Sequence, residues 1–175
     1  ANIDAVHVTS GVGSLEFCEL VPNDVALHYH CLEPHRGLYE DVLHRGIDGT
    51  PKRNLMLTRL LLGRQRGRDQ RMVDRLERRA LGSISGNSAW IQERISSVYG
   101  VESGILLPTV DISVWAGEQP KQASEHVVTI GGASWVKGTW ETLEMLSGTG
   151  IALYLIGGCK PREMGLLRRR ATELK

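Results

Sequence analysis

The sequence is poor in aromatic residues and in cysteine, and it has no long hydrophobic run. Only 5% of its 175 residues are aromatic, with a single Phe. The three cysteines are an odd number without ligand-like spacing, which argues against a disulfide scaffold or a zinc ribbon and favours a reducing compartment. No apolar stretch reaches the ~18 residues that a bilayer span needs. With 41% hydrophobic and 23% charged residues, the chain is nevertheless predicted to fold around a core.

The first residues lack the basic and apolar regions of a signal peptide, and a strand-like segment follows almost at once. This start suggests a chain that continues upstream. Because a sheet cut short would leave exposed strand edges, homo-oligomer formation is also an expectation.

Positive charge is concentrated in one stretch, although the whole chain has a formal net charge of only +1. Residues 44–79 hold eleven Lys and Arg against four Asp and Glu, a local balance of +7. Such a stretch either meets a polyanion (nucleic acid, anionic lipid headgroups or a diphosphate) or is a solvated helix face whose arginines pair with carboxylates. Of these polyanions, an anionic membrane surface is the expected partner. We expect no nucleic-acid partner, because no recognised motif accompanies the charge.

The first part of the chain predicts alternating strands and helices. Thr50-Pro51 is read as a helix start, and Asn87-Ser88 as the cap of a helix that Gly100 ends. The predicted strands are 5–9, 25–31 and a buried strand at 104–108, and residues 82–86 are predicted to be a short strand or a turn. The predicted helices are 37–45, 50–62, 69–80 and 88–99.

A polar segment at residues 116–125 contains Pro120 and is predicted to be a linker. After it, the order of predicted elements changes. The order is strand 126–130, glycine-rich loop 131–138, helix 139–146, strand 151–156 and a helix that opens at Pro161. This β-loop-α-β-α order predicts a parallel sheet covered by helices, and therefore an α/β fold.

The loop from Gly131 to Gly138 is the main candidate for a phosphate site. It follows a strand and precedes a helix, where backbone N–H groups and the helix dipole favour an anion, and Lys137 can add a charge. The loop is neither a Walker loop nor a Gly-x-Gly-x-x-Gly motif. The alternative is an ordinary glycine-rich turn with an exposed lysine.

Three histidines lie around the end of the second predicted strand, near Glu33. His28 and His30 are predicted to share one side of the strand, with His35 shortly after it. They could bind a metal or act in acid–base chemistry, but partial burial with a backbone hydrogen bond is the favoured interpretation. No Gly-x-Ser-x-Gly elbow is present, which excludes the corresponding hydrolase triad.

Four segments, taken in order, resemble the retaining GT-B glycosyltransferases of group 1 (family 4), in particular the mannosyltransferase-like members. Residues 31–40, Cys-Leu-Glu-Pro-His-Arg-Gly-Leu-Tyr-Glu, resemble the family's Cys-His-Glu-Pro-Pro-Arg-Tyr-Leu-Tyr-Glu. The other three are residues 68–88, ending Gly-Asn-Ser; residues 91–111, with Val-Tyr-Gly and Leu-Pro-Thr-Val-Asp; and residues 131–157, with Lys-Gly and Ile-Gly.

The resemblance implies Rossmann-like parallel sheet layers of a GT-B enzyme, truncated at both ends. Residues 1–115 would be the end of the N-terminal acceptor-binding domain, 116–125 the linker, and 126–175 the start of the C-terminal nucleotide-sugar-binding domain. The parent activity would be transfer, with retention, of a hexose such as mannose from a nucleoside diphosphate sugar to a lipid-linked or saccharide acceptor. The expected setting is cytoplasmic, peripheral at the inner membrane face, and the reaction needs no cofactor or resident metal.

The resemblance also implies site residues. Lys137, with Gly131 and Gly132, would bind the donor diphosphate, and a charge there stabilises the leaving group. Glu33 and Arg36 match a segment on the acceptor side of the cleft. The family histidine falls at Leu32, and His30 or His35 would have to substitute for it. No catalytic residue is assigned.

Two further departures concern the donor side. The family arginine that pairs with the lysine falls at Gly132 or Ala133, and no two glutamates stand eight apart as the donor motif requires. We expect that glutamate pair beyond Lys175 and the acceptor domain's glycine-rich loop before Ala1. The alternative is a degenerate, non-catalytic relative that binds or scaffolds.

Overall fold

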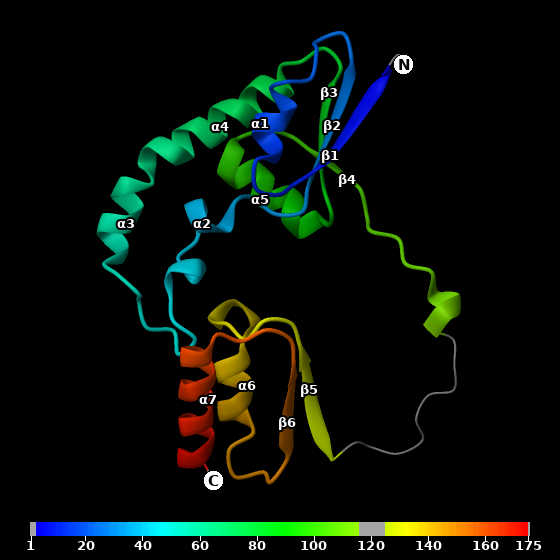
Figure 1. Ribbon diagram of the computed structural model, residues 1–175. Helices are drawn as coiled ribbons and strands as arrows, with labels where there is room; N and C mark the ends of the chain where they lie inside the picture. Colours follow the sequence, from blue (N-terminus) through cyan, green and yellow to red (C-terminus); the bar gives the residue numbers. More distant parts are fainter. Residues whose placement is uncertain (1–2, 116–124, 175) are drawn as a thin grey trace. The chain divides into compact units, whose positions relative to one another are not determined.

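The computed structural model describes residues 3–115 and 125–174, which divide into two compact units (Figure 1). The first unit comprises Ala1–Tyr39 and Leu57–Ile112, and the second comprises Glu40–Met56 and Ser113–Lys175. Nearly all of the predicted linker, residues 116–124, lies outside the described residues.

The first unit is built on a four-stranded parallel sheet in the order β1-β2-β3-β4, which confirms the predicted α/β class. This sheet with its helices is compatible with a Rossmann-like fold. Its strands are β1 (Ala5–Thr9), β2 (Ala26–Cys31), β3 (Gly82–Gly86) and β4 (Gly104–Ile105). Its helices are α1 (Ser14–Cys18), α2 (Arg36–Tyr39), α3 (Leu55–Leu61), which begins two residues before this unit, α4 (Gly63–Glu77) and α5 (Ala89–Tyr99). The 3₁₀ turn η2 (Ile112–Trp115) begins at the last residue of this unit, and its other residues belong to the second.

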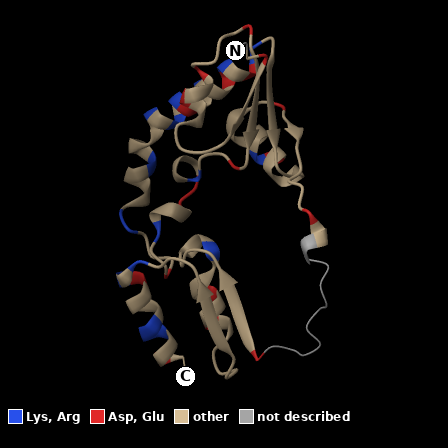
Figure 2. Ribbon diagram, turned by 45° about the vertical axis from the view of Figure 1, so that its right-hand side comes forward, with Lys and Arg blue, Asp and Glu red and all other residues tan. Residues whose placement is uncertain are grey.

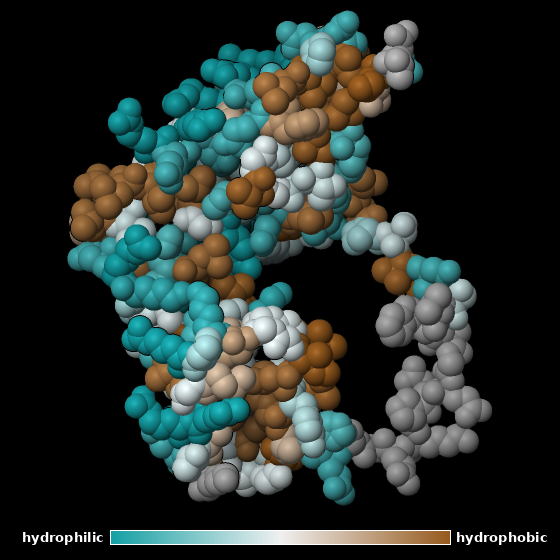
Figure 3. All heavy atoms as spheres, viewed as in Figure 1, coloured by the Kyte–Doolittle hydropathy of each residue, from teal (hydrophilic) through white to brown (hydrophobic). Residues whose placement is uncertain are grey.

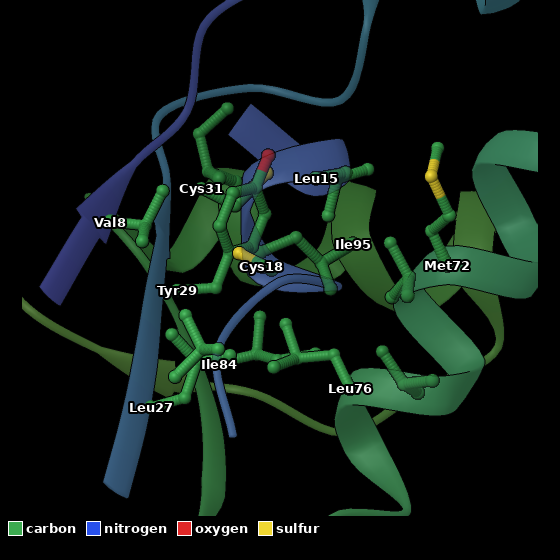
Figure 4. Close-up of a cluster of buried hydrophobic side chains, with 14 residues drawn as sticks. Val8, Leu15, Cys18, Leu27, Tyr29, Cys31, Met72, Leu76, Ile84 and Ile95 are labelled. Carbon is green, nitrogen blue, oxygen red and sulfur yellow. The ribbon is translucent and has the colours of Figure 1, made fainter. Parts of the chain in front are cut away.

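One face of this sheet forms the main hydrophobic core with α1, α4 and α5. Figure 4 shows Leu27 and Tyr29 of β2 gathered with Leu76 of α4 and Ile95 of α5, and Ile95 has no exposed surface. Side chains alternate along a strand, so β2 turns its intervening residues to the opposite face. That opposite face carries histidines and serines instead of apolar residues.

Three predicted elements of this part are wrong or incomplete. Thr50-Pro51 does not start a helix, because Pro51 forms an antiparallel bridge with Arg45 and α3 begins only at Leu55. The predicted helix 37–45 is two short pieces, α2 and the 3₁₀ turn η1 (Val42–His44). The strand at 104–108 shrinks to β4, whose two residues are exposed, since it pairs with β3 alone at the sheet edge.

The second unit contains the predicted β-loop-α-β-α segment. Strands β5 (His126–Ile130) and β6 (Ala152–Ile156) pair in parallel. Helices α6 (Thr139–Met145) and α7 (Pro161–Glu173) pack on one face of this pair, with η3 (Trp135–Lys137) in the loop after β5 (Figure 1).

Residues 40–56 pack with the second unit, whereas the sequence analysis assigned them to the first domain. The anchor is Ile47, which is 1% exposed and clusters with Ala133 and Leu167. Burying one such side chain contributes about 1.5–3 kcal/mol. A contact between residues so distant in sequence cannot be read from local pattern.

Among the described residues, no helix combines the length and apolar character that crossing a membrane requires.

Candidate functional site

The site is built where the two strands of the second unit end. Gly131 donates its N–H to the Ile156 carbonyl at 2.8 Å, and Ala133 donates to the Gly158 carbonyl at 2.9 Å. Gly157 has φ +148°, and a Cβ added there would overlap the Gly131 carbonyl. The two glycine turns therefore lie in direct backbone contact, and only glycine fits at residue 157.

Lys137 lies in the loop after β5 and reaches back over its first glycine. A Cβ added at Gly131 would lie 3.7 Å from Lys137 Cε, in ordinary van der Waals contact. Two residues earlier, the ring of Trp135 covers Gly49, where an added Cβ would lie 2.8 Å from the ring carbons. Because Gly49 also has φ +77°, this position requires glycine, and the contact sets residues 44–52 beside the loop that carries Lys137.

A cavity of about 300 Å³ opens between these two segments of the second unit. Three basic side chains and one acidic side chain are among those that line it, together with Gly132 from the predicted site. The lining residues are Val42, Leu43, Arg45, Ile47, Lys52, Gly132, Ser134, Trp135, Val136, Lys137 and Glu163.

Residues 44–52 form a closed loop, which we call the basic loop. Lys52 donates its N–H to the His44 carbonyl at 2.9 Å, and Gly46 donates to the Thr50 carbonyl at 2.7 Å. The Arg45 guanidinium donates from Nη1 to the Gly49 carbonyl at 2.8 Å. These bonds hold Arg45 and Lys52 at neighbouring positions of a fixed loop.

The turn of the basic loop is fixed by one carboxylate. Asp48 accepts hydrogen bonds from the Thr50 hydroxyl and from the Thr50 backbone N–H. The hydroxyl bond is the main reason that the Asp48 pKa is lowered from its usual value. An aspartate carboxyl is ionised near neutral pH even without this shift, and in that form it accepts both bonds that keep the turn closed.

The charged side chains that line the cavity are mostly basic, and such a charge attracts anions. Within the described part of the chain, neither Lys52 nor Lys137 forms a side-chain hydrogen bond or ion pair, and Glu163 is not paired with either. Helix α6 has only seven residues, so the positive charge at this cavity is that of side chains rather than of the helix terminus that the sequence suggested. Sequence reasoning found Lys137 but missed Arg45 and Lys52. Both were visible only as members of the long basic stretch.

The residues predicted for the acceptor side lie at the carboxyl end of β2 in the first unit. Glu33 and Arg36 form an ion pair, Oε2 to Nε at 3.4 Å, across the turn that leads into α2. His30 is buried and its Nδ1 hydrogen-bonds with Ser85 Oγ at 3.0 Å. Glu33 and Arg36 therefore hold each other, and His30 is held by a serine of β3.

The histidines form a stack on the open face of this sheet. His28 and His30 do lie on one side of β2, as predicted, and their ring centroids are 6.5 Å apart. The third member is His7 of β1, 5.1 Å from His28, whereas His35 is an exposed residue outside the stack.

Serine hydroxyls, not backbone groups, hold the His28 and His30 imidazoles of this stack. His28 meets Ser83 Oγ at 2.8 Å and Ser85 Oγ at 2.9 Å. Burial, followed by the nearby His7 and His30, lowers the His28 pKa. The described residues contain no group of three side chains placed to hold a metal ion.

Much of the basic stretch has structural partners, as Figure 2 suggests from the acidic positions beside the basic ones of α4. Arg66 donates to the Leu38 carbonyl, which ties α4 to α2. Arg79 donates to three backbone carbonyls of the loop before β2. Further ion pairs join Arg68 to Glu16, Arg75 to Glu19 and Arg78 to Asp74. Arg68, Arg75 and Arg78 therefore support the interpretation as a solvated face paired with carboxylates, whereas Arg66 and Arg79 bind backbone carbonyls.

The predicted site residues thus form two groups. Lys137, Gly131 and Gly132 lie together in the second unit. His30, Glu33 and Arg36 lie at one strand end of the first. Comparison with protein-family models, with curated proteins and with solved structures finds no match for the chain.

Proposed function

We infer that the second unit is the nucleotide-sugar-binding part of a retaining GT-B glycosyltransferase. The chain would serve to transfer a hexose such as mannose from a nucleoside diphosphate sugar to a lipid-linked or saccharide acceptor. The observation that carries this proposal is the cavity at the ends of β5 and β6, where Lys137 lies over Gly131. Ligands of open parallel sheets bind at the carboxyl ends of the strands.

The chemistry required of this site is modest. When a glycosidic bond to a diphosphate breaks, negative charge grows on the leaving oxygen, and a fixed cation nearby stabilises the transition state. Lys137 can provide that charge in the second unit. In the first unit, the Glu33–Arg36 pair supplies polar groups for an acceptor hydroxyl.

Calorimetry with UDP and GDP tests the proposal. We expect weak binding to the full chain, weakened a further tenfold or more in Lys137→Ala, because a charged hydrogen bond contributes about 1.5–3 kcal/mol. Lys160→Ala is the matched control, since Lys160 lies in the same unit but does not line the cavity. Equal loss in both variants, or no measurable binding to the wild type, would contradict the proposal.

The second candidate is a non-catalytic relative that binds without transferring. It is favoured by Leu32, which stands exposed where the family carries its histidine, and by the missing glutamate spacing. Release of free sugar from a bound nucleoside diphosphate sugar separates the candidates. A chain that binds the donor but releases no sugar from it would be the non-catalytic relative.

A peripheral membrane contact is the partner that we propose for the basic stretch, centred on α3. This seven-residue helix exposes Met56, Leu57, Leu60 and Leu61, each more than half exposed. Figure 3 shows apolar side chains gathered over α3 beside hydrophilic ones. Arg64 follows directly and has no side-chain partner among the described residues. Exposed leucines beside cations are typical of interfacial helices on anionic lipid.

Vesicle co-sedimentation tests this contact. Leu60→Ser with Leu61→Ser should lower binding to phosphatidylglycerol-containing vesicles at least tenfold, because each leucine removes apolar area from the interface. Leu106→Ser with Leu107→Ser is the control, an exposed leucine pair outside α3. Arg64→Ala should weaken vesicle binding about fivefold, and high salt should weaken it as well. Vesicle binding that is unchanged both in the α3 variants and at high salt would refute the contact.

A further inference from the structure

We propose that the basic loop supplies two of the three cations that hold the diphosphate, namely Arg45 and Lys52 beside Lys137. The inference rests on the proposed function and adds binding residues to the same cavity. Its starting observation is that Arg45, Lys52 and Lys137 line one cavity of about 300 Å³.

The charges of the cavity fit a diphosphate. Three basic side chains face one carboxylate, Glu163, and this leaves a formal balance of +2. A diphosphate carries two or more negative charges at neutral pH, and it needs donors on both of its phosphoryl groups. Two lysines contribute point charges, whereas the guanidinium of Arg45 offers a planar fork that matches phosphate oxygens.

Arg45 keeps donors available for a ligand. Of its five N–H groups, a bond from Nη1 goes to the Gly49 carbonyl. That bond orients the guanidinium and leaves its other N–H groups able to donate to a ligand. Arg45 pairs with Pro51 in an antiparallel bridge, and Lys52 is the next residue after Pro51. Lys52 is therefore close to Arg45.

The basic loop is anchored before any ligand arrives. Ile47 is buried in the core of the second unit, and Trp135 lies over Gly49. Loop ordering therefore costs little on binding, which favours affinity. The cavity volume is at the lower end for ligand sites, so it suits the diphosphate rather than a whole nucleotide sugar.

Calorimetry on the full chain with inorganic pyrophosphate tests the proposal. Lys52→Gln and Arg45→Gln should each weaken binding about tenfold, and each should make binding less sensitive to salt. Glutamine at residue 45 keeps a donor for the Gly49 carbonyl, and Lys52 makes no side-chain bond within the described chain, so the loop should stay folded. Arg53→Gln, an exposed neighbour that does not line the cavity, should leave affinity unchanged. Glu163→Gln should tighten binding several-fold, because it removes the one like charge.

The outcomes separate this proposal from the proposed function. If Lys137→Ala weakens UDP or GDP while both basic-loop variants bind pyrophosphate like the wild type, the basic loop is not part of the site and the proposed function stands. If the basic-loop variants lose pyrophosphate but nucleoside diphosphates bind no more tightly than pyrophosphate, the three-cation site stands and the nucleotide-sugar function fails. Equal loss in Arg53→Gln would also overturn the proposal, since it would reflect net charge alone.

Discussion

Gly157→Ala should unfold the strand-end turns of the second unit and abolish the anion binding that we propose there. Its backbone is held at φ +148°, which a residue with a Cβ rarely adopts, and the added carbon would overlap the Gly131 carbonyl. Backbone strain of this kind costs about 1–3 kcal/mol and overpacking a further 1–3 kcal/mol. The expected loss of local stability is thus about 3 kcal/mol, enough to open both turns.

Hydrogen exchange at the amides of Gly131 and Ala133 measures this effect directly, because both donate to carbonyls at the end of β6 or beyond it. Gly158→Ala is the matched control, since an added Cβ there meets nothing within 4 Å. Exchange should be faster by about two powers of ten in Gly157→Ala and nearly unchanged in the control. Similar rates in the two variants would refute the tight contact between the turns.

Ile95→Ala should cost the first unit about 2–5 kcal/mol of unfolding free energy. The side chain is wholly buried in the cluster between α5 and β2, so its truncation loses transfer free energy and leaves a cavity. Ile112→Ala is the control, because that side chain is 78% exposed and should change stability by about 0.5 kcal/mol or less.

Urea unfolding followed by exchange at the amides of β2 reports the first unit specifically. The Ile95 variant should shift the midpoint strongly to lower urea, and the Ile112 variant should not. A small shift in the Ile95 variant would mean that the core relaxes around the missing atoms, contrary to the close packing of the cluster.

Local pattern was sufficient for most of the regular elements. Alternation predicted β1 and β2, and Ser88 does cap α5, with its hydroxyl accepting from the Ile91 N–H at 3.2 Å. Failures came where a distant contact overrides local preference. Pro51 has the signature of a helix start, yet it pairs with Arg45 in the closure of the basic loop.

The candidate site shows the same division. A glycine-rich loop with a lysine after a strand identified Gly131, Gly132 and Lys137, because those residues are close in sequence. The basic loop lies some 80 residues earlier, and nothing in its local pattern separates Arg45 and Lys52 from the other basic residues of the stretch. Their place in the cavity depends on the burial of Ile47.

The sequence by itself determined the parallel α/β class, the order of the strands along the chain and the loop that carries Lys137. It did so because hydrophobic periodicity, caps and glycines act over a few residues. Only the tertiary structure decided that residues 40–56 belong with the second unit and that His7 completes the histidine stack. Strand pairing and core burial join residues that are far apart in sequence, so such choices follow from packing and not from local pattern.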